Sequence, residues 1–355
     1  MEIPIMIPAD EPDNQLIRLL ETLVNGKRKI IVINDGSSSE YSDVFTKVES
    51  LITPDGGVLL THEVNYGKGK ALKTAFDYII KNLPDVIGVV TADSDGQHTV
   101  EFIYSFSDEF SKNPNCLILG VRSFDGDDIP WKSSFGNKLT MRVMKFVSGL
   151  SISDTQTGLR AIPFTFMKEL VDFGGNRFEF ETEMLLATVD KYEIREVTIP
   201  TIYESKDNHQ THFNPIKDSI NIYKILGKQF FKYILASASS FIVDILLFYI
   251  FCRVFKFNGL KEYIIVSTVI ARVFSAVFNY AVNYKKVFLS NETVAKSATK
   301  YFCLAILQMG CSALFVTLGV MATTGNEVVV KIIVDTILFF ISYKIQHRLV
   351  FAKRK

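Results

Sequence analysis

The sequence predicts an α/β domain with a mostly parallel sheet, followed by an all-α membrane domain of four helices. Short apolar segments alternate with helical segments over 1–213. Four apolar stretches follow within 232–355, and each approaches the ~20 residues that cross a hydrocarbon core. The charge divides in the same way, because residues 1–229 carry 24 basic and 33 acidic side chains, whereas residues 230–355 carry 15 and 5.

In the first domain, short apolar strands recur between helices. The expected strands are 2–7, 29–33, 57–60, 86–91 and 116–121, and the expected helices include 14–24 and 68–81. Strands that alternate with helices favour a parallel sheet covered on both faces. Ligands bind such sheets at the carboxyl ends of the strands. Here those ends carry Asp10, Glu11, Asp35, Asp93, Asp95 and Arg122.

Two carboxylates, Asp93 and Asp95, follow a fully apolar strand. Burying them is costly unless a cation offsets their charge. Mg²⁺ or Mn²⁺, together with a diphosphate, suits this position because both ions prefer oxygen ligands, and Gln97 offers a third oxygen. Gly96 allows the backbone to turn between them. A solvated Asp-rich turn is the alternative, and the other polar segments of this domain disfavour it.

Two further segments carry polar residues at the predicted edge. Residues 34–37, Asn-Asp-Gly-Ser, follow the second strand and are equally typical of a plain turn. Residues 65–71 begin a helix with glycines and with Lys68 and Lys70, which suits an anionic ligand at a helix N-terminus. This segment lacks both the Gly-Lys-Ser/Thr ending of a P-loop and the GxGxxG spacing of a dinucleotide fold. ATPase and dehydrogenase activities are therefore disfavoured.

Cysteine and charge patterns exclude other classes. Four cysteines show no CxxC pairing, which indicates reduced buried thiols rather than a zinc site. Basic residues in the second half are scattered between apolar runs, which is typical of a membrane protein rather than a nucleic-acid-binding one. The start of the sequence lacks a basic leader, so we expect the first domain to stay in the cytosol.

The membrane domain is predicted to contain spans at about 233–251, 263–282, 301–321 and 328–343. Polar residues interrupt these spans at Asp244, Arg272, Lys331 and Asp335. Lysines and arginines cluster before the first span, between the second and third, and after the fourth, which predicts a cytosolic C-terminus. Similar basic-aromatic edges open spans one and three and close spans two and four, which suggests two repeated hairpins or a coincidence of interface residues.

Residues 214–231 connect the two domains. Isoleucine, leucine and aromatic residues alternate there with Lys217, Lys224 and Lys228. An amphipathic helix in the plane of the lipid headgroups would use that mixture, and its position before a span favours this interpretation. An ordinary surface helix of the first domain is the alternative.

The polar segments together resemble a known family. Residues 8–11, 32–37, 65–71 and 93–98, in this order and spacing, resemble family 2 glycosyltransferases of the dolichyl-phosphate mannose synthase and polyprenyl-phosphate glycosyltransferase type. The resemblance covers about 1–210 and extends through 154–160 and 178–181. The membrane half resembles the GtrA-like four-helix family at Arg272, Asn279, Asn283 and 287–288. The resemblance implies a GT-A type, Rossmann-like nucleotide-sugar domain fused to a GtrA-like membrane domain.

The resemblance also implies an activity. A hexose would pass, with inversion, from a UDP- or GDP-linked sugar to a polyprenyl phosphate, either dolichyl or undecaprenyl phosphate, at the cytosolic membrane face. The product would be a polyprenyl-phosphate-linked sugar for envelope or protein glycosylation. The implied cofactor is Mg²⁺ or Mn²⁺, and the implied partners are the nucleotide-sugar donor, the lipid acceptor and membrane lipids, without nucleic acid. A four-span bundle with a repeat could also form a homo-oligomer.

By similarity, each group of residues has an expected role. The metal ligands would be Asp93, Asp95 and Gln97. Contacts to the nucleotide-sugar would come from Pro8, Ala9, Glu11, Asp35, Asn65, Lys68, Lys70 and Asp93. The acceptor phosphate would meet Arg122, Lys132 and Asp154, although Lys132 could equally form a surface ion pair and Asp154 could cap a turn. Catalysis would rest on Asp93, Asp95 and Arg122.

One residue departs from the pattern of the family, and two other functions compete with the predicted one. Relatives usually carry an aromatic residue at position 10, against the nucleotide base, whereas this chain has Asp10, so the choice between UDP and GDP stays open. A processive membrane polysaccharide synthase is one rival, but the single tryptophan, Trp131, lacks the Gln-x-x-Arg-Trp context of such enzymes. The other rival is a lipid-linked-sugar translocator whose front domain only binds nucleotide-sugar, and an intact metal set argues against it.

Overall fold

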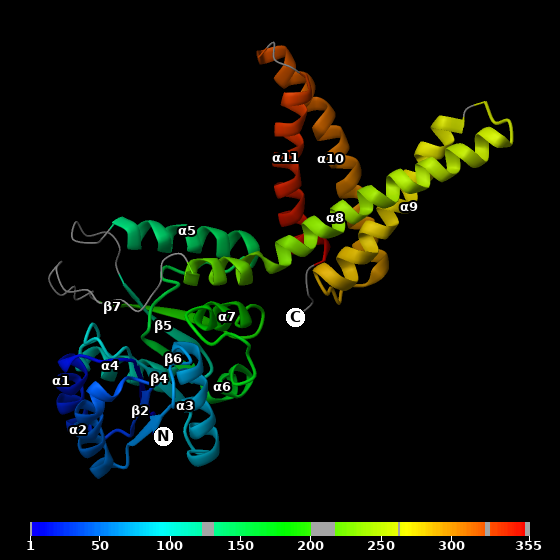
Figure 1. The fold of residues 1–355 in the computed structure, drawn as a ribbon. Helices are drawn as coiled ribbons and strands as arrows, with labels where there is room; N and C mark the ends of the chain where they lie inside the picture. Colours follow the sequence, from blue (N-terminus) through cyan, green and yellow to red (C-terminus); the bar gives the residue numbers. More distant parts are fainter. Residues whose placement is uncertain (1, 123–130, 200–216, 262, 324–326, 352–355) are drawn as a thin grey trace. The chain divides into compact units, whose positions relative to one another are not determined.

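The computed structural model describes residues 2–122, 131–199, 217–261, 263–323 and 327–351 (Figure 1). The chain divides into two compact units, Met1–Leu226 and Gly227–Lys355. Unit 1 holds the α/β domain, and unit 2 holds most of the helices expected in the membrane. The division falls inside the connecting segment 214–231, of which residues 214–216 lie outside the described residues.

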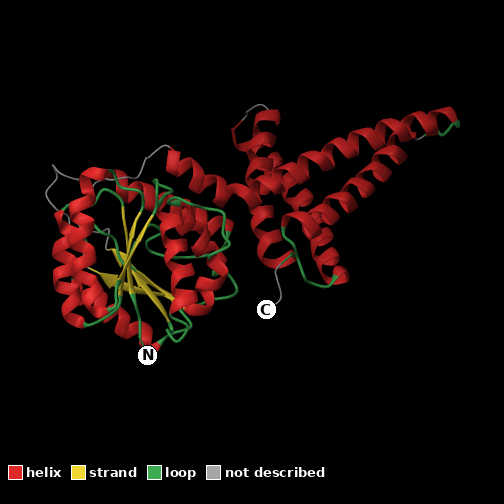
Figure 2. Ribbon diagram, turned by 60° about the horizontal axis from the view of Figure 1, so that its bottom comes forward, coloured by secondary structure: helices red, strands yellow, loops and turns green. Residues whose placement is uncertain are grey.

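Unit 1 is built on a seven-stranded sheet in the order β3-β2-β1-β4-β6-β5-β7. The strands are β1 Ile5–Ala9, β2 Ile30–Asn34, β3 Val58–Thr61, β4 Gly88–Thr91, β5 Leu117–Arg122, β6 Arg160–Pro163 and β7 Ile194–Ile199. Neighbouring strands are parallel except at β6, which runs antiparallel to both β4 and β5. The predicted mostly parallel sheet is therefore confirmed, and helices flank it in Figure 2.

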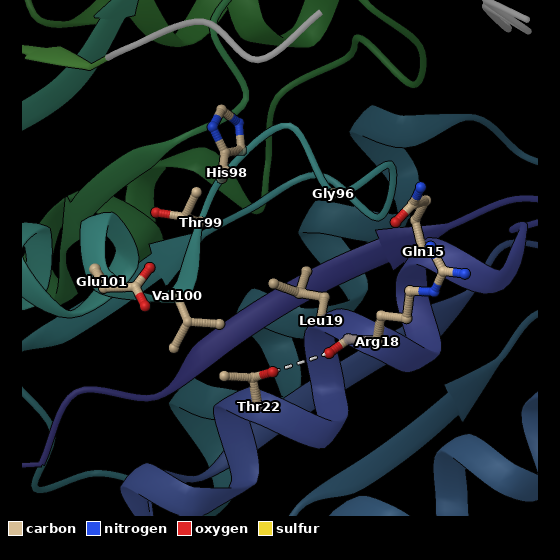
Figure 3. Close-up of a pocket in the computed structure, with 9 residues that line it drawn as sticks. All are labelled: Gln15, Arg18, Leu19, Thr22, Gly96, His98, Thr99, Val100 and Glu101. Atoms are coloured by element: carbon tan, nitrogen blue, oxygen red, sulfur yellow. Dashed lines mark hydrogen bonds between the residues drawn. The ribbon is translucent and has the colours of Figure 1, made fainter. Parts of the chain in front are cut away.

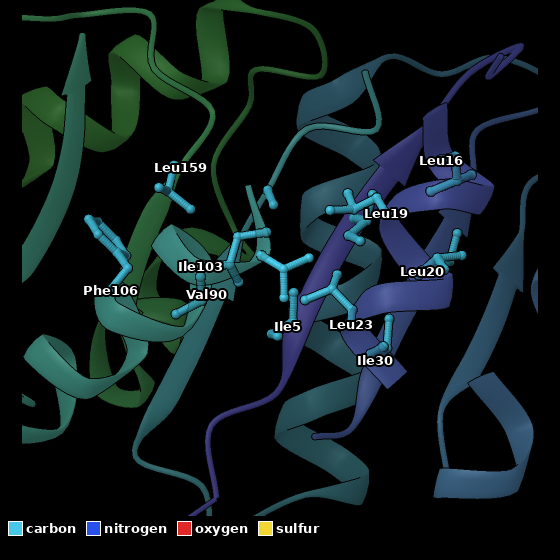
Figure 4. Packing of buried hydrophobic residues seen from close by; sticks show 14 of the residues in the cluster. Ile5, Leu16, Leu19, Leu20, Leu23, Ile30, Val90, Ile103, Phe106 and Leu159 are labelled. Carbon is cyan, nitrogen blue, oxygen red and sulfur yellow. The ribbon is translucent and has the colours of Figure 1, made fainter. Parts of the chain in front are cut away.

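Alternate residues of each strand point to opposite faces of the sheet, so both faces need cover. On β1, Ile5 and Ile7 lie in one apolar cluster and Met6 lies in the other. The first cluster includes residues of α1 Asn14–Leu23, α2 Ser42–Ile52 and α4 Val100–Lys112 (Figure 4). The second includes residues of α3 Lys68–Asn82, α5 Trp131–Val147, α6 Phe164–Leu170 and α7 Glu179–Ala187.

Local sequence signals start two helices near the predicted positions. The Asp13 side chain caps α1 by accepting a hydrogen bond from the backbone N–H of Gln15 at 2.8 Å. Helix α3 begins at Lys68, directly after Gly67, whose φ of 98° is one that glycine adopts without a steric penalty. These two helices lead away from the carboxyl edge of the sheet, so their first turns lie beside the polar residues of that edge.

Strands β7 and β6 are both missing from the sequence prediction, and the reason is clearest for β6. Its residues, Arg-Ala-Ile-Pro, include a proline and a charged side chain, which are depleted in strands. The strand exists because distant partners hold it, including the Thr91 hydroxyl, which accepts a hydrogen bond from the Arg160 N–H at 3.1 Å. The strand expected at 2–7 is found at Ile5–Ala9 instead, because β1 pairs with β2 over Ile5–Ala9.

The first turns of α8, Lys217–Phe257, belong to unit 1. Ile222 and Leu226 are buried in the cluster that also holds residues of α3 and α7. Asp218 is fully buried and accepts a hydrogen bond from Arg177 Nε at 3.4 Å. This part of the connecting segment therefore packs on the α/β domain, while Ile220 on the same helix is exposed. A role of 214–231 at the lipid interface stays a prediction.

Unit 2 consists of the rest of α8 and of α9 Tyr263–Val282, α10 Val294–Thr323 and α11 Glu327–Ile345. Helix α9 has the bounds of the predicted second span. Among the described residues, two helical segments, Asp218–Phe257 and Val294–Ala322, are long and apolar enough to cross a membrane by length and composition.

Both hairpins of unit 2 end in a π-helical turn, Asn283–Val287 after α9 and Gln346–Val350 after α11. The Asn283 side chain donates a hydrogen bond to Gln346 Oε1 at 3.2 Å, and Gln346 Nε2 donates to the Tyr233 hydroxyl at 3.1 Å. Next to them, the rings of Phe288 and Phe351 stack with centroids 5.1 Å apart. The two turns occupy matching places, as an internal repeat predicts.

The packing of the first apolar cluster leads to a stability prediction. Phe106 is 1% exposed and labelled in Figure 4, so we expect Phe106→Ala to lower the free energy of unfolding of unit 1 by about 3–5 kcal/mol. Phe102, on the same helix, is only partly buried, and Phe102→Ala should cost clearly less. Thermal unfolding of the purified full chain measures both, and equal losses in the two variants would contradict this description of the core.

Candidate active site

The carboxyl ends of β2, β1 and β4, which are neighbours in the sheet, bring three polar groups to one edge. The first is Asp35 with the loop 62–67, the second is Asp10 with Asn65, and the third is Asp93 with Asp95. Parallel strands end at the same edge, so these groups are brought together by topology rather than by sequence proximity.

Asp35 anchors the loop 62–67 to the end of β2. Its carboxylate accepts hydrogen bonds from the backbone N–H groups of Tyr66 at 3.1 Å and Gly67 at 2.8 Å. The His62 Nδ1 atom lies 2.7 Å from the same carboxylate, and His62 Nε2 lies 2.9 Å from the Thr74 hydroxyl. Asp35 is 3% exposed, so its main structural effect is to fix this loop.

Hydrogen bonds from neighbouring loops also fix the residues that follow β1. Asn65 Nδ2 donates a hydrogen bond to Asp10 Oδ2 at 2.5 Å, and the Glu11 N–H donates to the Ser37 hydroxyl at 2.8 Å. Glu11 has a φ of 45°, a left-handed conformation that is uncommon outside glycine and is often found at functional sites. Pro8 and Ala9 are buried residues of β1, so their side chains do not open to this edge.

Asp93 lies in a network of charges that are partly or fully buried. The Lys68 ammonium lies 2.7 Å from Asp93 Oδ1 and 3.1 Å from Glu181 Oε1, and Arg160 lies 3.9 Å from Glu181. Burial alone would raise the pKa of Asp93, but the charge of Lys68 holds that pKa well below its usual range. Burial would likewise lower the pKa of Lys68, and the two carboxylates raise it instead. Lys68 is therefore the counter-ion of Asp93.

Asp95 has no such counter-ion among the described residues. Its Oδ1 atom accepts a hydrogen bond from the Gln97 N–H at 3.1 Å. Asp95 is exposed as a residue, but the partial loss of water around its carboxyl group raises its pKa, and the neighbouring negative charge of Asp93 raises that pKa further. A raised carboxyl pKa means that the ionised form lacks stabilisation, so a cation placed beside Asp95 would stabilise this edge.

These residues fit a divalent cation with oxygen ligands. Asp93 and Asp95 supply carboxylates, and Gln97 is partly exposed next to them. Both ring nitrogens of the buried His98 lack a hydrogen-bond partner, and Nε2 lies 3.7 Å from Asp93 Oδ2, which indicates a polar site whose partners are incomplete. In the described part of the chain, no three His, Cys, Asp or Glu side chains form a ready-made metal site.

The absence of a side chain at Gly158 leaves room for the Asp93 carboxylate. The Asp93 carboxylate lies directly against Gly158, where a Cβ atom would overlap it. The Gly158 carbonyl oxygen in turn accepts a hydrogen bond from the Thr91 hydroxyl at 2.6 Å. The strand before Asp93 and the loop before β6 thus hold each other, and the carboxylate is fixed between Gly158 and Lys68.

A fourth polar group follows β5. The Arg122 side chain donates two hydrogen bonds to Asp154, from Nε at 2.7 Å and from one terminal nitrogen at 3.2 Å. Asp154 is fully buried, and Asn137 of α5 fixes its loop by accepting hydrogen bonds from both the N–H and the hydroxyl of Thr155, at 3.1 and 2.9 Å. Arg122 is thereby held in one orientation at the carboxyl end of its strand.

The structure leaves the predicted contact Lys70 apart from this cluster. Lys70 is exposed on the first turn of α3, and the side chain of Lys132 lies outside the described residues. Three residues that sequence reasoning passed over do contribute: Glu181, Arg160 and His62. Glu181 and Arg160 lie in segments that carry the family resemblance, but only the tertiary fold reveals that they share a buried charge network with Lys68.

A pocket of about 250 Å³ is lined in part by Gly96 and His98, which closely follow Asp95 in the sequence (Figure 3). It is formed by α1, through Gln15 and Arg18, and by the segment that follows Asp95, through Gly96, His98 and Glu101. Asp93 and Asp95 do not line it. The pocket is therefore a neighbour of the candidate metal site rather than the site itself.

A mostly parallel GT-A type sheet with paired carboxylates at its carboxyl edge is typical of a glycosyltransferase domain. Residues 5–171 match the family model for glycosyl transferase family 2, and residues 232–351 match the GtrA/DPMS transmembrane domain. The chain belongs to these families as a fusion of a family 2 glycosyltransferase domain with a GtrA/DPMS transmembrane domain. No curated protein matches it.

Two solved structures give weak overall likenesses. The mannosyltransferase PcManGT from Pyrobaculum calidifontis, in complex with GDP-Man and Mn²⁺, is 13% identical with a TM-score of 0.40, over 98% of this chain and 87% of that one. GalNAc-T7, with UDP, GalNAc and Mn²⁺, is 14% identical with a TM-score of 0.39, over 68% of this chain and 51% of that one. At these scores neither likeness carries information about the activity of this chain.

The buried charge network predicts a strong effect of removing Lys68. We expect Lys68→Met to destabilise unit 1 by about 3–5 kcal/mol, because Asp93 and Glu181 would lose their shared counter-ion. Lys81→Met is the control, since it removes only an exposed pair with Asp77 and should cost less than about 1 kcal/mol.

Thermal unfolding of the full chain in metal-free buffer measures these losses. Adding Asp93→Asn to Lys68→Met should recover part of the lost stability, because one uncompensated charge is then removed. A Lys68→Met variant that unfolds like the wild type would contradict the assignment of Lys68 as counter-ion.

Proposed function

We propose that this glycosyltransferase moves a hexose from a UDP- or GDP-linked sugar to a polyprenyl phosphate at the cytosolic face of the membrane. The product is a polyprenyl-phosphate-linked sugar for envelope or protein glycosylation. The observation that carries the proposal is the pair Asp93 and Asp95 at the carboxyl edge, with the anchored loop 62–67 on one side and Arg122 on the other. A nucleotide-sugar needs such an edge, with one part for the nucleoside and one for the diphosphate.

The donor half of the site rests on the carboxylates. Asp95 and Gln97, with Asp93 beside them, would hold Mg²⁺ or Mn²⁺ on the donor diphosphate. Bound there, the cation would offset the negative charge that develops as the nucleoside diphosphate departs. Lys68 keeps Asp93 ionised and fixed, which we propose as its contribution to donor binding. Glu11, Asp35 and Asn65 would shape the nucleoside end of the site.

The acceptor half rests on Arg122. A phosphate monoester is largely ionised at pH 7 and can attack without a strong general base. One of its oxygens would form a bond to the anomeric carbon while the bond from that carbon to the donor diphosphate breaks, so the configuration inverts. Arg122, oriented by Asp154, would supply positive charge for the approaching phosphate, and Lys132 is a second candidate for this role.

The acceptor also gives the membrane domain a purpose. A polyprenyl phosphate keeps its tail in the bilayer and its headgroup at the surface, so the enzyme must work at a membrane. Within unit 2, Arg272 forms an ion pair with Asp244 at 3.5 Å, and Asp335 accepts a hydrogen bond from Ser312. Polar groups inside a membrane are costly and are often functional, so these residues are candidates for handling the lipid-linked product.

Turnover with a panel of donors tests the proposed function. Purified full-length protein in lipid nanodiscs would receive labelled UDP- and GDP-sugars, Mg²⁺ or Mn²⁺, and a short-chain polyprenyl phosphate. We expect one donor to yield a labelled lipid that contains a single sugar in inverted configuration. No glycolipid with any donor would contradict the transfer reaction, and a lipid carrying a growing polymer would instead support a processive synthase.

A further inference from the structure

The loop 62–67 presents an aromatic ring to solvent. Tyr66 is 47% exposed, and it is the one exposed aromatic side chain in the described part of unit 1. Its ring meets His62 edge-on, with centroids 5.4 Å apart and an interplanar angle of 74°, so one ring face is not used by that contact. Aromatic rings contribute most to stability when buried, so the exposure of Tyr66 calls for an explanation.

The backbone beneath Tyr66 is fixed more firmly than an ordinary surface loop. Its own N–H and that of Gly67 donate to Asp35, and His62 contacts the same carboxylate. On the other side, the backbone of Val64 and Asn65 passes so close to Gly36 that a Cβ atom at Gly36 would overlap it. Gly36 also has a φ of 74°, which favours glycine. The ring is therefore preorganised rather than free to move with a flexible loop.

The position of Tyr66 relates it to the diphosphate end of the site. Lys68, whose ammonium lies 2.7 Å from Asp93 Oδ1, follows Tyr66 by two residues. The backbone between Tyr66 and Lys68 therefore spans at most about 7 Å. On the other side, Asn65 bonds to Asp10 at the end of β1. Strand β1 itself brings an aspartate and no ring to this edge. Tyr66 is thus the ring that the described structure offers for a flat ligand group near the carboxylates.

We propose that the Tyr66 ring is the platform on which the nucleobase of the donor nucleotide stacks. This inference rests on the proposed function, because it names the residue that recognises the nucleoside end of the same donor. Stacking of a base on an aromatic side chain stabilises binding by about 1–3 kcal/mol, and any base has a flat face that can use it. A preorganised ring adds to affinity because little conformational entropy is lost on binding.

Binding of free nucleotides separates this inference from the transfer reaction. The dissociation constants of UDP and GDP, each with Mn²⁺, would be measured by calorimetry on the full-length wild type and on Tyr66→Ala, Tyr66→Phe and Val64→Ala. We expect Tyr66→Ala to weaken the better nucleotide by about 5- to 150-fold, which is the stacking range above. Tyr66→Phe keeps the ring and should bind like the wild type.

Val64→Ala is the matched control, because Val64 is 53% exposed in the same loop but carries no ring. It should bind nucleotide like the wild type. Saturation-transfer NMR gives a second readout, in which irradiation of the tyrosine ring protons should reach the base protons in the wild type but not in Tyr66→Ala. Thermal unfolding of Tyr66→Ala should match the wild type, since the loop is held by backbone contacts.

Two outcomes would count against different claims. If the wild type binds nucleotide and Tyr66→Ala binds it equally well, with the base protons still receiving magnetisation from protein, the platform is not Tyr66 and this inference is wrong. If the wild type binds neither UDP nor GDP, the proposed function itself fails.

Discussion

The Lys68 ammonium between Asp93 and Glu181 is the interaction on which the carboxyl edge depends. Two carboxylates two residues apart at the end of a buried strand repel each other and lose hydration, and Lys68 offsets the charge of one of them. Lys68 lies there because α3 begins directly after Gly67, and the Gly67 N–H donates a hydrogen bond to Asp35, which directly follows β2. The charge balance at β4 therefore depends on a loop anchored at β2.

This arrangement leaves the two carboxylates with different properties. Asp93 has a counter-ion, a glycine surface against its carboxylate and a low pKa, whereas Asp95 has a raised pKa and no counter-ion among the described residues. The pair can therefore be stable as a folded structure and still favour a further cation at Asp95. The same loop that positions Lys68 also exposes Tyr66, so the proposed diphosphate end and the proposed nucleoside end of the site share one anchored loop.

Much of this could be predicted from the sequence. Alternating apolar strands and helices predicted the mostly parallel sheet. The resemblance of the polar segments, and of a few positions in the membrane half, indicated the two families that the chain matches. Strand β6 could not be predicted, because its Arg-Ala-Ile-Pro residues become a strand only through pairing with β4 and β5. The contacts that Lys68 and Asp35 make within the protein could not be predicted either, and their predicted contacts to a ligand stay predictions. Their partners, Glu181 and His62, are 113 and 27 residues away in the sequence.

We propose that this edge holds a nucleoside diphosphate together with a divalent cation at Asp95. Calorimetric titration of UDP and GDP into the full-length protein, with Mn²⁺ and then with a chelator, tests it directly. We expect nucleotide binding that needs Mn²⁺ and that is lost in Asp95→Asn but kept in Asp77→Asn, which alters an exposed ion pair on α3. Nucleotide binding that is unchanged by chelation, or that Asp95→Asn retains at wild-type affinity with Mn²⁺, would contradict the account.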